Sequence, residues 1–168
     1  MPEPFFGKYR GTVEQNIDDM NQGRVQVSCP NVLGRGRFSW ALPCVPYAGP
    51  GVGFFAIPPI GASVWVEFEC GDPDWPIWSG CFWDKGQLPP AMPALPTTRA
   101  FKTDALDLQV MELPGIGGLK LTVGPPALGV PASIEMTVKG IKLAFAKSTI
   151  EIGPEGVRIN GTNLVVLP

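Results

Sequence analysis

The sequence predicts an all-β protein in which a small closed barrel of Greek-key type is followed by a chain of very short strands. Apolar and polar residues alternate over many short segments, which is the period of a strand with one buried face. Glycine and proline account for 21 and 20 of the 168 residues, and they separate these segments as turns do. No segment has the apolar spacing of a long helix. We therefore expect five or six strands in roughly the first 80 residues.

Residues 57–83 form the clearest predicted hairpin, around which the first domain is built. Its first strand alternates two sets of side chains, namely Val64, Val66 and Phe68 against Trp65, Glu67 and Glu69. Residues 71–74 (GDPD) combine glycine, proline and two aspartates, and this composition predicts a turn. Residues 75–83 return as an aromatic second strand, in which Ser79 and Gly80 predict a bulge or a close backbone approach.

Three further strands are expected before this hairpin, at residues 6–13, 23–29 and 38–45. Pro43 places part of the last one at an edge or a bulge. The polar residues 14–22 and the glycine-rich residues 30–37 are expected to be connections. Residues 47–59 form a longer connection, whose aromatic pair Phe54 and Phe55 we expect to pack back onto the core.

A proline-rich stretch at residues 86–98 predicts a linker of extended, polyproline-like chain. It divides the sequence into a first domain at residues 1–85 and a second at residues 99–168. Tryptophan, tyrosine and cysteine do not occur after the linker, and short alternating strands remain.

The second domain is expected to need partner chains. A strand of about five residues cannot bury its own apolar face, and the chain is too short for a second covering layer. Intertwined copies would close a prism without open edges around a shared apolar core. The alternative is one sheet of an ordinary sandwich. The residues expected in the shared core alternate along the strands and are Ile134, Met136, Val138, Ile141, Leu143, Phe145, Ile150, Ile152, Val157, Ile159, Leu164 and Val166.

Composition argues against several classes of function. The net charge is −2, and acidic residues outnumber basic ones by nine to six in residues 1–90, so we expect no binding to nucleic acid. There is no histidine, and the four cysteines are too far apart for a zinc knuckle, so we expect no metal site and no cofactor. No membrane span or export signal is apparent. Without export, we expect four buried, apolar cysteines: Cys29, Cys44, Cys70 and Cys81.

Several residue pairs and loops invite a chemical interpretation, and each has a simpler one. Glu67 and Glu69 on one strand face resemble an acid and base pair, but carboxylates on an outer face are usually solvated. Asp72 and Asp74 could hold calcium, although the turn explains them without an ion. The glycine-rich stretches 49–53 and 115–120 open no predicted helix, and we expect them to connect strands. No catalytic residue and no enzymatic activity are therefore predicted.

The first domain resembles a known family in four stretches that cover most of its length. They are GKYRGTV at 7–13, GRVQVSCPNVLG at 23–34, WALPCVPYAG at 40–49 and PPIGASVWVEFECGDPDWPIWSGCFW at 58–83. These residues resemble the baseplate assembly protein V and central spike family of contractile phage tails and contractile injection systems. The family is related to the valine-glycine repeat spike of type VI secretion.

The resemblance implies an OB-fold at residues 1–85 that docks on a trimeric hub at the end of the tail tube. It also implies that residues 99–168 form an intertwined trimeric β-helix, a needle that punctures the target membrane. The protein would then be part of a virion tail baseplate or injection-machine particle that assembles in the bacterial cytoplasm. We expect Arg35 and Arg37, in a glycine-flanked loop, to contact a protein partner.

Two further features of the family bear on this chain. Some members carry a lysozyme domain between barrel and needle, where this chain has only its linker. Other members end in an iron-binding His-x-His tip, which a chain without histidine cannot form. We therefore expect residues 160–168 to end bluntly or to be capped by a separate PAAR-type tip protein.

The alternative function is an OB-fold that binds single-stranded nucleic acid or an oligosaccharide. Aromatic residues would provide the stacking platform for such a ligand. The candidates are Trp40, Trp65, Trp75, Trp78, Trp83 and Tyr47, with Arg24, Arg35 and Arg37 for phosphate contacts.

Overall fold

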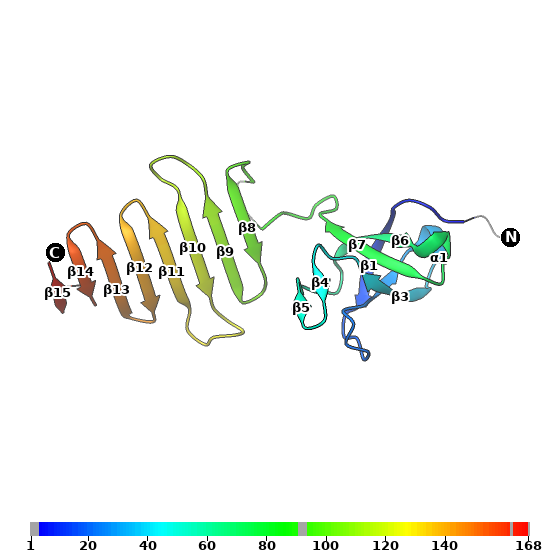
Figure 1. The fold of residues 1–168 in the computed structure, drawn as a ribbon, viewed down its shortest axis with the longest axis horizontal. Coiled ribbons are helices and arrows are strands. Elements are labelled where there is room, and N and C mark those ends of the chain that lie inside the picture. Colours follow the sequence, from blue (N-terminus) through cyan, green and yellow to red (C-terminus); the bar gives the residue numbers. More distant parts are fainter. Residues whose placement is uncertain (1–3, 91–93, 162, 168) are drawn as a thin grey trace. The chain divides into compact units, whose positions relative to one another are not determined.

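The computed structural model describes residues 4–90, 94–161 and 163–167, and all its regular elements are strands apart from two helical turns. The all-β prediction is thus confirmed. Contacts between residues divide the chain into two units, residues 1–87 and 88–168 (Figure 1). Each unit is described by itself below.

The first unit is a closed five-stranded barrel, as predicted. Its strands are β1 (Tyr9–Gln15), β2 (Val25–Ser28), β3 (Phe38–Pro43), β6 (Ser63–Phe68) and β7 (Pro76–Phe82). They are hydrogen-bonded in the order β1-β2-β3-β7-β6, and β6 returns to β1. Neighbours are antiparallel except β3 and β7, which run parallel where Leu42 lies opposite Ile77. This parallel pair closes the barrel.

The barrel core is small and built mainly from β-branched residues. Burial along β6 follows the alternation in the sequence, because Val64, Val66 and Phe68 point inward. Trp78 lies in the core, where its indole Nε1 donates a hydrogen bond to the Gly23 carbonyl at 3.3 Å. The buried apolar residues are Val13, Val25, Val27, Cys29, Ala41, Val64, Val66, Phe68 and Trp78.

The hairpin of β6 and β7 forms where the sequence predicts it. A 3₁₀ turn (η1, Glu69–Gly71) follows β6, and the Asp72 carboxylate then accepts a hydrogen bond from the Asp74 amide at 3.0 Å. Val64 pairs with Cys81 while Val66 pairs with Trp78, so two residues, Ser79 and Gly80, lie opposite Trp65. The bulge expected at this pair is therefore confirmed.

Two connections of the barrel differ from the expected loops. A single helical turn, α1 (Pro30–Leu33), follows β2. A ribbon of two very short strands, β4 (Ala48–Gly49) and β5 (Val52–Gly53), follows β3.

Several residues expected in the core are at the surface instead. Phe54 and Phe55 are both more than half exposed, so the prediction that they pack onto the core is wrong. The cysteines differ from expectation as well, because only Cys29 is buried while Cys44, Cys70 and Cys81 are exposed. Cys70 lies in the 3₁₀ turn, outside the alternation that buries its neighbours on β6.

Asp18 organises the loop between β1 and β2. Its side chain is 4% exposed and pairs with Arg24 at 2.6 Å. It also accepts hydrogen bonds from the backbone amides of Met20, Gln22 and Arg24. Arg24 in turn lies over the Trp40 ring, 5.3 Å from its centroid. The hydrogen bond from the Arg24 side chain holds the pKa of the Asp18 carboxyl well below its usual range, and the three amides act in the same direction.

We expect Asp18→Asn to lower the stability of the barrel at neutral pH. The substitution should also make that stability depend less on pH in the acidic range. A lowered pKa in the folded state stabilises the protein fully above the pKa of the unfolded chain, about 3.9. This stabilisation is lost as the pH falls below that value. Urea midpoints at pH 7 and pH 3 should therefore differ more for the parent than for Asp18→Asn. Asp19→Asn, an exposed neighbour, is the control, and an equal effect from it would contradict the role of Asp18.

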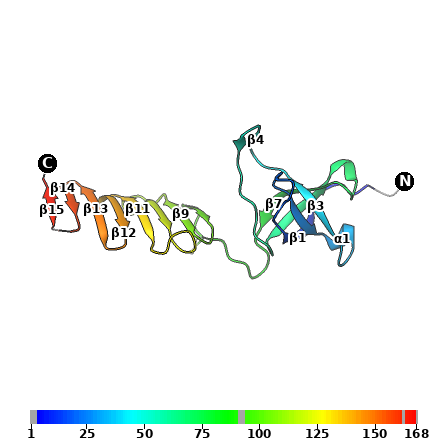
Figure 2. The same ribbon diagram turned by 90° about the horizontal axis from the view of Figure 1, so that it is seen from below.

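The second unit is a single antiparallel sheet of eight strands that follow one another in sequence order (Figure 1). They are β8 (Thr98–Lys102), β9 (Leu106–Met111), β10 (Gly118–Val123), β11 (Ala132–Thr137), β12 (Gly140–Phe145), β13 (Ser148–Gly153), β14 (Gly156–Ile159) and β15 (Leu164–Val166). Figure 2 shows this sheet as one layer. Among its described residues, 88–90, 94–161 and 163–167, none is fully buried.

Neither unit contains, in the residues that the structure describes, a helix with the length and apolar character needed to cross a membrane.

Candidate assembly surface

The strand register of the second sheet brings its apolar side chains together on one face. Successive partners across β10 to β15 form two continuous rows that run perpendicular to the strands. The first row contains Leu119, Met136, Ile141, Ile152, Val157 and Val166. The second row contains Leu121, Ile134, Leu143, Ile150, Ile159 and Leu164. Val110 and Leu108 on β9 extend the two rows.

A shorter third row lies on the same face beside the other two. Phe145 pairs with Ala132 on one side and with Ser148 on the other, so an aromatic ring stands between two small residues. Its side chain is 55% exposed, and that of Leu164 is 52% exposed. Fully covering side chains that are half exposed would contribute about 1 kcal/mol each. The face therefore offers a large free-energy gain to any surface that covers it.

The structure places the expected core residues on this face with one exception. Val138 lies in the turn between β11 and β12, so it does not continue the strand that carries Ile134 and Met136. Two strands that were not predicted to contribute, β9 and β10, also carry part of this face. The alternation of LDLQV at 106–110 and LKLTV at 119–123 was the signal that could have identified them.

No second sheet covers the apolar face in the described part of the second unit, where eight strands form one layer. The only other sheet among the described residues besides the barrel is the two-stranded ribbon of the first unit.

The opposite face of the sheet is charged, and its charges alternate in sign. Lys120, Glu135, Lys142, Glu151 and Arg158 are successive cross-strand partners on β10 to β14. Lys120 pairs with Glu135 at 2.9 Å and Lys142 with Glu151 at 2.8 Å. Hydrogen bonding and charge attraction raise the pKa of Lys142 and lower that of Glu151. Opposite charges across strands favour this register.

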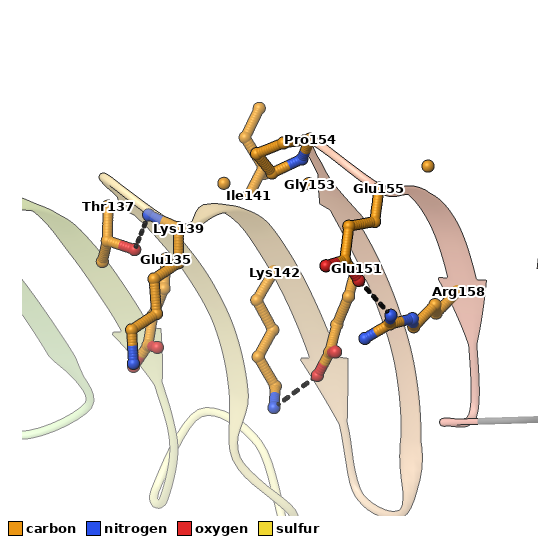
Figure 3. A pocket seen from close by; sticks show the side chains of 12 residues that line it. Glu135, Thr137, Lys139, Ile141, Lys142, Glu151, Gly153, Pro154, Glu155 and Arg158 are labelled. Carbon is orange, nitrogen blue, oxygen red and sulfur yellow. Dashed lines mark hydrogen bonds and ion pairs between the residues drawn. The ribbon is translucent and has the colours of Figure 1, made fainter. Parts of the chain in front are cut away.

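A shallow hollow on this charged face contains both acidic and basic side chains (Figure 3). Figure 3 shows that Lys142 points to Glu151 and that Arg158 points to Glu155. The charges satisfy one another at the solvent boundary. This arrangement suits a hydrated outer surface better than a binding site for a charged ligand.

The barrel does not assemble the acid and base pair that the sequence suggested. Glu69 begins the 3₁₀ turn, so it does not share a strand face with Glu67. Glu67 instead pairs with Lys8 at 3.2 Å, and Lys8 donates a hydrogen bond to the Ser79 hydroxyl at 2.8 Å. Hydrogen bonds from Ser79 and Lys8 lower the pKa of Glu67. Lys8 thus contacts both the Glu67 carboxylate and the Ser79 hydroxyl.

The other suggested sites are accounted for by local structure. Asp72 completes a turn with the Asp74 amide. In the described part of the chain, no group of three or more acidic or cysteine side chains could hold a metal ion. Residues 49–53 belong to the ribbon of β4 and β5, and residues 115–120 lead into β10.

The tryptophans do not form one stacking platform. Trp78 is in the core, where it cannot meet a base. Trp65 packs against Phe82 with ring centroids 4.5 Å apart, and Arg10 lies near both rings. Trp75 and Trp83 are exposed. These different environments weaken the alternative of a ligand-binding barrel.

Arg35 and Arg37 are exposed in the connection between α1 and β3, as their glycine-rich surroundings suggested. The structure brings them to the surface, and their role in partner binding stays a prediction.

Comparison with known proteins agrees with the barrel topology. Residues 9–83, from the first strand to just beyond the last strand of the barrel, match the family described as the type VI secretion system/phage-baseplate injector OB domain. The match covers the barrel and leaves the second unit outside it. The resemblance recognised in the sequence is therefore confirmed for the OB domain.

A curated relative extends the match to the spike proteins. The chain is 33% identical over 99 residues to the type VI secretion system spike protein VgrG4b of Pseudomonas aeruginosa strain PAO1. The match covers 58% of this chain but 11% of that protein, so the chain corresponds to a small part of its relative. Together, the matches support a structural role related to spikes of injection machines.

Proposed function

We propose that this protein is the central spike of a contractile phage tail or contractile injection system, and that it acts as a homotrimer without catalytic activity. The observation that carries the proposal is the continuous apolar face of a single-layer sheet, joined to an injector OB domain. Three copies would turn this face inward and form an intertwined β-helix. The number three comes from the resemblance to spike proteins.

In this assembly each surface of the chain has a physical role. The charged ladder on β10 to β14 coats the outside of the needle and keeps it soluble. The apolar rows form its dry interior, so unpartnered subunits would be unstable. The barrel seats on a hub protein at the end of the tail tube, with polar contacts from Arg35 and Arg37. The needle transmits the force of sheath contraction to the target membrane, and a PAAR-type tip protein would cover its end.

The experiment that tests the trimer is the mass of the protein in solution. One chain has a mass of 18.0 kDa, so light scattering on a size-exclusion column should give about 54 kDa. A shortened chain that ends at Pro96 lacks the apolar sheet and should elute as a single barrel. If the full chain also has the mass of one copy, the needle is excluded.

A further inference from the structure

The longest uncharged stretch of the barrel includes the ribbon of β4 and β5. The 29 residues from Phe38 to Val66 contain no aspartate, glutamate, lysine or arginine. Part of this stretch is core, but the residues around the ribbon are at the surface. Surfaces without charges that are rich in aromatic residues are typical of the centre of protein interfaces.

We call residues 47–55, which contain β4 and β5, the finger. Its two strands pair through Ala48 with Gly53 and Gly49 with Val52, and the Phe54 amide donates to the Tyr47 carbonyl at 2.8 Å. Figure 2 shows β4 standing away from the strands of the barrel. A ribbon with so few pairs is marginally stable in water, so contacts beyond its own strands must help to hold it.

The finger leaves an apolar groove against the barrel. Gly23 lies at the base of this groove, and a Cβ atom added there would come within 3.4 Å of the Phe55 ring. The Phe55 side chain is nevertheless 79% exposed, and that of Tyr47 is 62% exposed. The residues that line the groove are uncharged and, apart from Gln22, mostly apolar or small, and they include Gly23, Tyr47, Val52, Phe54, Phe55 and Trp78. The Phe55 ring projects beside a groove of about 370 Å³. One chain therefore carries both a side chain that could insert and a groove that could receive it.

Two arguments select another copy of this chain as the occupant. An uncharged patch does not favour partners that are recognised by charge, such as nucleic acid or anionic lipid. The same patch on a second copy is equally uncharged and therefore electrostatically compatible with it. In addition, 15 residues separate Phe82, which ends β7, from Thr98, which begins β8. They can span at most about 50 Å. Copies joined through their sheets would hold their barrels at an effective concentration on the order of millimolar.

We propose that the finger of one barrel docks in the groove of the neighbouring barrel, so that the three barrels form a closed ring. This inference rests on the proposed trimer and assigns it a second contact, independent of the needle. A contact between two different patches generates a ring when its rotation closes, and the proposed trimer requires closure after three copies. Tyr47 and Phe55 are the anchors, because exposed aromatic residues that become buried dominate interface energies.

The test measures distances between barrels in the full chain with nitroxide labels and pulsed electron resonance. The label is attached at Asp74→Cys, in a chain where the exposed Cys44, Cys70 and Cys81 are replaced by serine. The substitution should preserve the turn, because the Asp72 carboxylate accepts its hydrogen bond from the backbone amide of residue 74 and not from the side chain. Docked barrels should give a narrow distance distribution.

The variant that carries both Tyr47→Ser and Phe55→Ser should keep the mass of three chains but lose the narrow peak. The control variant carries Phe6→Ser and Trp83→Ser, which remove two exposed aromatic side chains outside the finger. It should keep the narrow peak.

The outcomes separate the two proposals. A parent trimer with a broad distribution would overturn the ring and leave the finger to a different protein, while the needle stands. A narrow peak that survives loss of both anchors would place the contact elsewhere and also overturn the inference. A parent with the mass of one chain would overturn the proposed function itself, and the ring with it.

Discussion

Replacing Leu143 with aspartate is expected to reduce the mass of the full chain from three copies to one. Leu143 lies in the second apolar row, between Ile134 and Ile150. A carboxylate at this position would be buried without a partner in the proposed needle, and each copy would add another. Burying an unpaired charge costs several kcal/mol, more than the contact of the lost side chain. Light scattering at micromolar concentration measures the result.

The matched control for this prediction is the next residue along the same strand. Ala144 faces the opposite side, where its partners are Ser133 and Thr149. Ala144→Asp therefore introduces the same charge on the hydrated surface, and it should leave the mass at three copies. If both variants dissociate, or neither does, the assignment of the inner face is wrong.

Replacing Gly140 with alanine is expected to destabilise the second unit strongly, although the substitution adds only one methyl group. Gly140 begins β12 with φ 129°, a conformation that residues with a side chain rarely adopt. An added Cβ atom would overlap the carbonyl oxygen of Ile152 on β13. The unfavourable backbone and the overlap together should cost about 3 kcal/mol per chain. The melting temperature should then fall by more than about 10 °C, as followed by circular dichroism.

Gly129 provides the control for this substitution. It lies in the connection between β10 and β11, and no atom lies within 4 Å of the position that its Cβ would occupy. Gly129→Ala should therefore change the melting temperature little. A comparable loss from both substitutions would show that the effect does not come from the Gly140 backbone. Gly156, which has φ 112° and faces the Val166 carbonyl in the same way, should behave like Gly140.

The barrel could be predicted well where its strands alternate. Val64, Val66 and Phe68 are inward and the bulge lies at Ser79 and Gly80, because period and turn composition are local properties. The prediction was wrong for residues that were expected to be buried only because they are apolar. Phe54 and Phe55 are as apolar as any core residue, yet the closed barrel is already filled by Phe68, Trp78 and smaller side chains.

In the second unit, alternation alone predicted which side chains share a face, and the amphipathic strands of β11 to β15 follow it. It failed at Val138, because the chain turns at Thr137 before the pattern ends. It also could not exclude a sandwich, since a strand sequence does not specify what covers its apolar side. The structure shows the sheet as a single layer in the residues that it describes.

The sequence by itself determined the all-β class, the turns and the inward side of each strand, because these depend on residues close together in the chain. It also carried the resemblance to the injector OB domain. Only the tertiary structure decided the parallel closure of β3 on β7, the alignment of the apolar rows and the exposure of the finger. These features depend on pairing between residues far apart in the sequence, where register decides which side chains meet.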